Sequence, residues 1–171
     1  MSSKTNSDAS YKKITNAWCL YDWGSSAFST TGEAAVLPVY FNIITKGVFK
    51  PATATAYWGY VNALSLLVAA FLAPILGSIA DYTGAKKKLL SFFAGIGIIA
   101  TLLMVFINTG DGVLALILFF FGSIGLGASY IFYDSLLPHI AKEEDSDYIS
   151  SKGYALGYLG GGLLLAINIA M

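Results

Sequence analysis

The chain has 171 residues, of which 56% are apolar and 12% are charged, with a mean hydropathy of +0.67. Soluble domains carry about 25% charged residues, so this composition excludes an ordinary soluble domain and indicates a membrane protein. The ten basic residues are all lysines that balance ten acidic residues and cluster between apolar runs, which excludes a nucleic-acid-binding surface. The single cysteine, Cys19, excludes an intramolecular disulfide framework and a thiolate metal cluster, and we expect no metal and no cofactor.

Hydropathy predicts an all-α, polytopic helical bundle with about five transmembrane helices. Each expected span can cross a hydrocarbon layer of about 30 Å at about 1.5 Å per residue. Residues 1–16 are polar and form an expected N-terminal tail, and residues 17–171 form the membrane domain. The first span is not a signal peptide, because it is too long and carries two acidic residues. Alternatively, this weakly apolar segment lies in the membrane interface, which would leave four spans. The expected spans cover residues 17–44, 55–80, 89–107, 113–138 and 153–171.

The lysines predict the orientation of the helices. With the N-terminus in the cytoplasm, eight lysines fall on the cytoplasmic side and only Lys46 and Lys50 fall outside. We expect a bacterial inner-membrane protein, and the lysine distribution predicts that its N-terminus is cytoplasmic. The acidic segment 139–152 is an expected cytoplasmic loop that contains a solvated His139, and 108–112 is an expected outer turn.

Polar residues form a stripe along the first expected helix. At roughly 100° per residue around the helix axis, the four other members of the stripe fall within about 40° of Asp22. Carboxylates near the middle of a membrane cost about 2.5–3.5 kcal/mol each, so the stripe predicts a water-filled or protein-lined cavity that binds a proton, a cation or a polar solute. Alternatively, Asp22 lies among the headgroups and Glu33 only bonds a neighbouring helix. The stripe comprises Asp22, Ser26, Ser29, Glu33 and Tyr40.

The fourth expected helix carries a similar stripe of Ser123, Gly127, Tyr130 and Asp134. Both Asp22 and Asp134 follow a tyrosine, which weakly suggests inverted three-helix repeats. Two interfacial Tyr-Asp pairs that arose by chance would give the same pattern.

Small residues predict two helix-packing faces. One face, on the second helix, consists of Ser65, Ala69, Ala73 and Gly77, which recur every four residues. The fifth helix has Gly153, Gly157 and Gly161 at the same spacing, which predicts either close packing or a flexible gating helix.

The turn between the second and third helices has the pattern GxxxDxxGxKK. Gly77 permits close helix contact, Asp81 can favour the N-terminus of a partner helix, and Gly84 permits a tight turn. The following lysines hold the loop in the cytoplasm. The motif residues are Gly77, Asp81, Gly84, Lys86, Lys87 and Lys88.

This turn resembles the signature of the major facilitator superfamily. The runs AWCLYDWGSSAFSTT (17–31), LPVYF (37–41), DSLLPHIA (134–141) and SSKGYALGYLGG (150–161) resemble the branch named after the fungal autophagy-related vacuolar effluxer. The resemblance implies a secondary transporter of about twelve helices that works by alternating access, with helices one and four lining its cavity. It also links the fungal members to amino-acid efflux from the vacuole. The chain departs from the family pattern in two places. Residues 142–148 lack the arginine often found there, and the fifth helix lacks the Gly-Pro pair that is typical of the superfamily's antiporters, so we do not assign an antiporter.

Together these features predict the N-terminal portion of a secondary transporter for a small polar solute, with amino acids as one candidate class. An odd number of spans that ends at Met171 leads us to expect a fragment of a longer protein. The expected partners are the lipid bilayer, the solute, a coupling proton or cation, and the missing C-terminal helices. Two alternatives are a helical membrane scaffold and an intramembrane aspartyl protease, although the nearest string to the protease GxGD motif, 109–112, lies in the outer turn.

Overall fold

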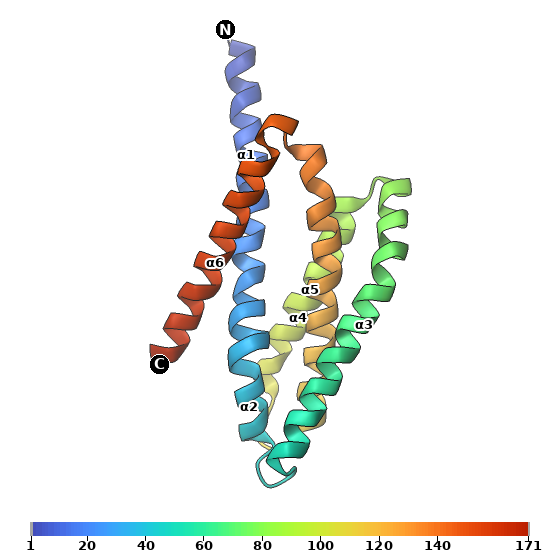
Figure 1. Cartoon of the computed structure of the whole chain (residues 1–171), viewed down its shortest axis with the longest axis vertical. Helices are drawn as coiled ribbons and strands as arrows, with labels where there is room; N and C mark the ends of the chain where they lie inside the picture. Colours follow the sequence, from blue (N-terminus) through green and yellow to red (C-terminus); the bar gives the residue numbers. More distant parts are fainter. Residues whose placement is uncertain (1, 171) are drawn as a thin grey trace. The chain divides into compact units, whose positions relative to one another are not determined.

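The computed structural model describes residues 2–170, and their side chains from residue 8 onward. The described chain is almost entirely helical, which confirms the expected all-α bundle (Figure 1). Four of its helices are long and apolar enough to cross a membrane. The helices are α1 (Ser2–Ala27), α2 (Leu37–Ile44), α3 (Pro51–Thr83), α4 (Lys86–Leu103), α5 (Gly112–Ile140) and α6 (Ser146–Ala170), with the short elements η1 (Phe28–Val36), η2 (Met104–Phe106) and η3 (Glu143–Asp145).

The four candidate spans correspond to the second to fifth predicted spans, and each begins before its expected first residue. The predicted first span, 17–44, falls on α1, η1 and α2, which follow one another without a loop. This span is not among the four, so it stays a prediction. The helix also includes the expected tail, since α1 begins at Ser2.

The expected loop 139–152 is wrong at both ends. His139 lies in the last turn of α5, and its ring Nδ1 is 3.1 Å from the carbonyl oxygen of Ser135. Pro138 does not end the helix, because the backbone N–H of Ala141 still donates to the Leu137 carbonyl oxygen at 2.9 Å. At the other end, α6 begins at Ser146 with Asp147 in its first turn, where a negative charge favours a helix N-terminus.

The chain divides into two compact units. The first unit joins the segment up to Ala35 with the segment from Ser135 onward. Within it, the segment formed by α1 and η1 runs side by side and in parallel with the segment formed by η3 and α6, because the contact positions advance together along both. The pairs are Tyr11 with Asp145, Asn16 with Lys152, and Thr31 with Gly161.

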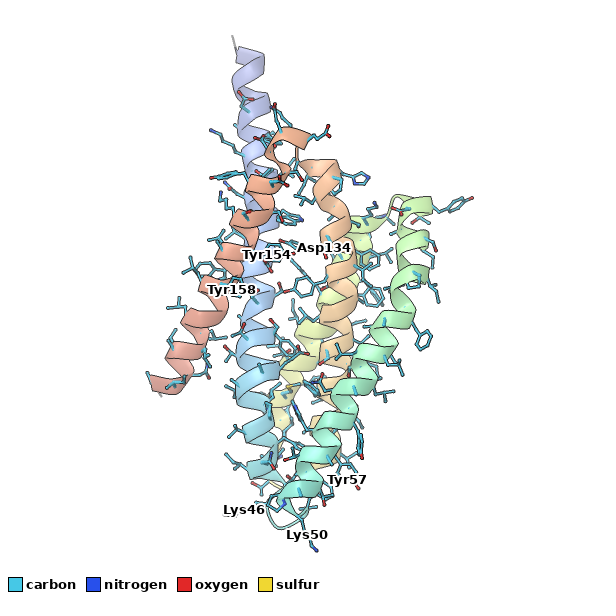
Figure 2. All side chains as sticks on the ribbon, viewed as in Figure 1. Lys46, Lys50, Tyr57, Asp134, Tyr154 and Tyr158 are labelled. Carbon is cyan, nitrogen blue, oxygen red and sulfur yellow. The ribbon has the colours of Figure 1, made fainter. Side chains whose placement is uncertain are left out.

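The second unit, Val36–Asp134, is built on an aromatic core. The ring of Trp58 stacks on Phe119 with centroids 3.9 Å apart, and the centroid of the Phe41 ring lies 5.6 Å from that of Trp58. The backbone N–H of Gly110 donates to the Ile44 carbonyl oxygen at 2.8 Å, which joins the turn before α5 to the end of α2. Figure 2 shows Lys46, Lys50 and Tyr57 at the same end.

Glycines also bring α4 and α5 together in the second unit. A Cβ atom on Gly125 would lie 2.5 Å from the backbone nitrogen of Gly97 and 2.8 Å from the Phe93 carbonyl oxygen. The outer surface of α4 remains apolar, with Phe92, Ile99 and Leu102 largely exposed. An apolar surface of this extent fits a lipid environment, because burial in hydrocarbon stabilises it and water does not.

Candidate functional site

The carboxylate of Asp22 is the most buried of the predicted site groups. Asp22 is only 4% exposed within the first unit. The Ser26 hydroxyl, one helical turn later on α1, donates a hydrogen bond to its Oδ1 at 3.2 Å. The sequence placed these two residues on one stripe, and the structure brings them into direct contact.

The glycine face of α6 makes room for this pair. A Cβ atom at Gly157 would lie 2.8 Å from Oδ2 of Asp22 and 2.7 Å from Oγ of Ser26. Further along, a Cβ atom at Gly160 would lie 2.5 Å from the Trp23 carbonyl oxygen, and one at Gly161 would lie 2.6 Å from Oγ1 of Thr30. The packing interpretation of the α6 glycines is therefore confirmed, and the contact that it serves is with α1.

Ser29 and Glu33 lie in η1, a π-helix, so the assumption of regular α-helical geometry is wrong there. A π-helix bonds each residue to the fifth along, which changes the angle between successive side chains. Serine hydroxyls near this segment donate hydrogen bonds to backbone carbonyl oxygens, which gives these oxygens partners other than the helical N–H groups. Ser25 donates to the Tyr21 carbonyl oxygen at 2.9 Å, and Ser29 donates to that of Ser26 at 3.2 Å. Glu33 is half-buried in this segment.

Tyr40, the last member of the first stripe, lies outside this arrangement. It belongs to α2 in the second unit, and its hydroxyl donates to the Ile107 carbonyl oxygen at 3.2 Å. It therefore ties α2 to the segment that follows η2 within the second unit.

The stripe on the fourth expected helix lies wholly within α5, so the predicted alignment of its members holds. Asp134, labelled in Figure 2, is exposed, and Tyr130 is half-buried beside the edge of the Tyr133 ring. Gly127 is near α3, where a Cβ atom on it would lie 3.4 Å from Cβ of Ala69. Of the four members of this stripe, only Asp134 is exposed.

The motif turn has two features that the structure resolves. Gly84 ends α3 with a φ of 62°, in the left-handed region where a residue without Cβ is favoured. Asp81 forms a salt bridge of 2.7 Å with Lys86, the first residue of α4. A Cβ atom added to Gly77 would meet nothing within 4 Å in the described chain, so its predicted close contact stays a prediction. Lys87 and Lys88 are exposed.

Sequence reasoning missed two features of the first unit. The spacing of the α6 glycines was visible, but it did not indicate that Gly157 lies beneath Asp22. The sequence also gave no sign that Tyr11, in the expected tail, donates a hydrogen bond to Asp145 at 2.8 Å. Within the described residues, no group of three or more His, Cys, Asp or Glu side chains could hold a metal ion.

The fold and its polar residues define a multi-pass helical membrane protein that carries a buried carboxylate. The family model described as "Vacuole effluxer Atg22 like" matches residues 47–171. The chain therefore belongs to the Atg22-like vacuole effluxer family.

Comparison with known proteins gives relatives at moderate identity. The chain is 36% identical to an uncharacterized MFS-type transporter, YxiO, of Bacillus subtilis over 94% of its own length and 38% of that protein. It is 32% identical to autophagy-related protein 22 of Gibberella zeae over 48% of its length and 13% of that protein. An uncharacterized protein of Aquifex aeolicus is 28% identical over 87% of this chain and 36% of the relative. The chain thus spans well under half the length of these relatives, and no solved structure matches it.

Proposed function

We propose that this chain is the N-terminal portion of a secondary active transporter of the major facilitator type, which moves a small polar solute by alternating access. The name of the Bacillus subtilis relative, an MFS-type transporter, supports this assignment. Amino acids are the proposed solute class, following the resemblance to the fungal effluxers, and a proton or cation is the proposed coupling ion.

The observation that carries the proposal is the buried carboxylate of Asp22. A carboxylate inside a membrane span costs about 2.5–3.5 kcal/mol, so such a group is by default a functional one. Ser26 supplies a neighbouring hydroxyl, and the glycines of α6 hold this part of α1 against a second helix. Glu33 and Asp134 are the further proposed carboxylates of the site.

Alternating access needs two bundles that rock around a site between them, which this chain alone does not provide. The chain covers 38% of the Bacillus subtilis relative, so we propose that further C-terminal helices complete the transporter. We expect the isolated chain to show no saturable flux. The proposed setting is the bacterial inner membrane, which the Bacillus subtilis relative supports, and the lysine distribution supports a cytoplasmic N-terminus.

The proposal can be tested with a chimera in which this chain replaces the matching part of the Bacillus subtilis relative. Uptake of a panel of amino acids into proteoliposomes would be compared for the chimera and for Asp22→Asn, Glu33→Gln and Asp134→Asn. The matched control is Asp147→Asn, which removes an exposed carboxylate on α6. We expect Asp22→Asn to lower uptake by about tenfold or more, equivalent to about 1.4 kcal/mol, with the control unchanged.

Two results would count against the proposal. Uptake that is unchanged in all three carboxylate variants would show that these groups only bond neighbouring helices. A folded chimera that transports no member of the panel, beside an active Bacillus subtilis parent, would show that this chain does not form a working half.

A further inference from the structure

A cavity of about 270 Å³ lies within the first unit, between the middle of α1 and the segment that runs from the end of η3 into the start of α6. It is separate from the proposed transport residues, none of which lines it. Its polar lining comes from Tyr11, Lys12, Thr15 and Asn16 on one side and from Asp145, Tyr148 and Lys152 on the other.

Specific contacts between the two segments build the walls of this cavity. The Tyr11 hydroxyl donates to Oδ2 of Asp145 at 2.8 Å and accepts the backbone N–H of Lys142 at 3.2 Å. The Lys142 ammonium lies over the Tyr11 ring, 5.2 Å from its centroid. On the other side, the Lys152 ammonium donates to Oδ1 of Asn16 at 2.6 Å. The expected tail is thus held against the start of α6.

The groups that remain available in the cavity are mainly hydrogen-bond donors. Lys12 is exposed, and its ammonium has no hydrogen bond or ion pair with any residue that the structure describes. An ammonium has three N–H donors, so Lys152 retains donors after bonding Asn16. The Asp145 carboxylate already accepts a hydrogen bond from Tyr11. An excess of hydrogen-bond donors over acceptors fits an oxyanion, whose oxygens accept hydrogen bonds.

The charge of the lining indicates which oxyanion fits. Two lysines and one aspartate line the cavity, which leaves one net positive charge. This complements the single negative charge of a phosphodiester better than the double charge of a phosphomonoester. Three further acids, Glu143, Glu144 and Asp147, are exposed nearby but do not line the cavity. They oppose long-range attraction of anions, so binding must depend on the cavity itself.

We propose that this cavity binds the phosphodiester head group of an anionic phospholipid, such as phosphatidylglycerol. It lies at the N-terminal end of the candidate span Glu143–Ala170 and just before the predicted first span, where headgroups are expected. Basic pockets between transmembrane helices bind such head groups. Tyr148, which lines the cavity, is 70% exposed. Tyrosines of this kind are typical of the membrane–water interface.

The test measures lipid retention by the 171-residue chain itself, so it does not depend on the proposed transport. The protein would be released from nanodiscs of equimolar phosphatidylglycerol and phosphatidylcholine, and the retained lipids would be counted by native mass spectrometry. The variants are Lys12→Gln, Lys152→Gln and the charge-retaining Lys12→Arg. Lys13→Gln is the matched control, because Lys13 is exposed on the same helix but does not line the cavity.

We expect the wild-type chain to retain phosphatidylglycerol preferentially. Each Lys→Gln change in the cavity should lower this preference by about fivefold, while Lys12→Arg and Lys13→Gln leave it unchanged. Absence of a preference in the wild type, or an equal loss in Lys13→Gln, would overturn the proposal in favour of no site or of a diffuse surface attraction. Circular dichroism checks folding, and if Lys152→Gln unfolds the chain, Lys12→Gln decides the outcome.

A second arm identifies the source of the phosphodiester. Glycerophosphoglycerol, a soluble phosphodiester, would be titrated calorimetrically into the detergent-solubilised chain. Lysine-dependent binding of this probe, together with no lipid preference in nanodiscs, would overturn the lipid assignment. Lysine-dependent lipid retention, with weak or no binding of the soluble probe, supports it.

Discussion

The contact between α1 and α6 can be tested by adding single methyl groups to the glycines of α6. In Gly157→Ala, the new Cβ would lie 2.8 Å from Oδ2 of Asp22 and 2.7 Å from Oγ of Ser26. Both are the ends of side chains that can rotate away, so the methyl displaces the Asp22 carboxylate and the Ser26 hydroxyl. In Gly160→Ala, the new Cβ would lie 2.5 Å from the Trp23 carbonyl oxygen, which cannot move without the helix. Gly162→Ala is the control, because its Cβ would meet nothing within 4 Å.

The expected magnitudes follow from two opposing terms. Replacing glycine by alanine in a helix stabilises it by about 1 kcal/mol, whereas overpacking costs about 1–3 kcal/mol. Gly162→Ala should therefore stabilise the chain by up to about 1 kcal/mol. Gly157→Ala should destabilise it by about 1 kcal/mol, and Gly160→Ala by about 2 kcal/mol, because only a helix shift relieves the second clash.

The assay is thermal unfolding of the detergent-solubilised chain, followed by tryptophan fluorescence. At about 2–4 °C per kcal/mol, Tm should rise slightly in Gly162→Ala and fall by about 2–4 °C in Gly157→Ala and about 4–8 °C in Gly160→Ala. The penalty at Gly157 should shrink in a Ser26→Ala background, because the hydroxyl that the methyl meets is gone. Equal Tm values for Gly157→Ala and Gly162→Ala would show that α6 does not pack on Asp22.

The remaining predictions concern the turn after α3 and the topology. Gly84→Ala should lower Tm by about 2–8 °C, since a left-handed φ costs an L-residue about 1–2 kcal/mol, whereas Gly77→Ala should not lower it. Equal effects of the two changes would refute the role of the left-handed turn. In a Cys19→Ala background, a cysteine at exposed Val48 should react with an impermeant reagent from outside the cell, and one at exposed Glu144 should react only after the membrane is opened. The reverse pattern would invert the proposed orientation.

The sequence by itself determined the helical membrane character of this protein and the approximate positions of the candidate spans. Both depend on local properties, because any apolar run of sufficient length needs a helix to satisfy its backbone in lipid. The turn at Gly84 was equally predictable, since only a residue without Cβ adopts a left-handed φ at little cost. The stripe on α5 kept its alignment because that helix is regular.

Only the tertiary structure decided which surfaces meet. The spacing of the α6 glycines indicated close packing, but Gly157 is paired with Asp22 by contacts between segments far apart in the chain. The same holds for Tyr11 and Asp145, which attach the expected tail to the start of α6. The π-helix that carries Glu33 was also hidden, because it uses the same residue types as an α-helix. Hydropathy reports the environment that a residue prefers, whereas the partner of a residue depends on how distant helices fit together.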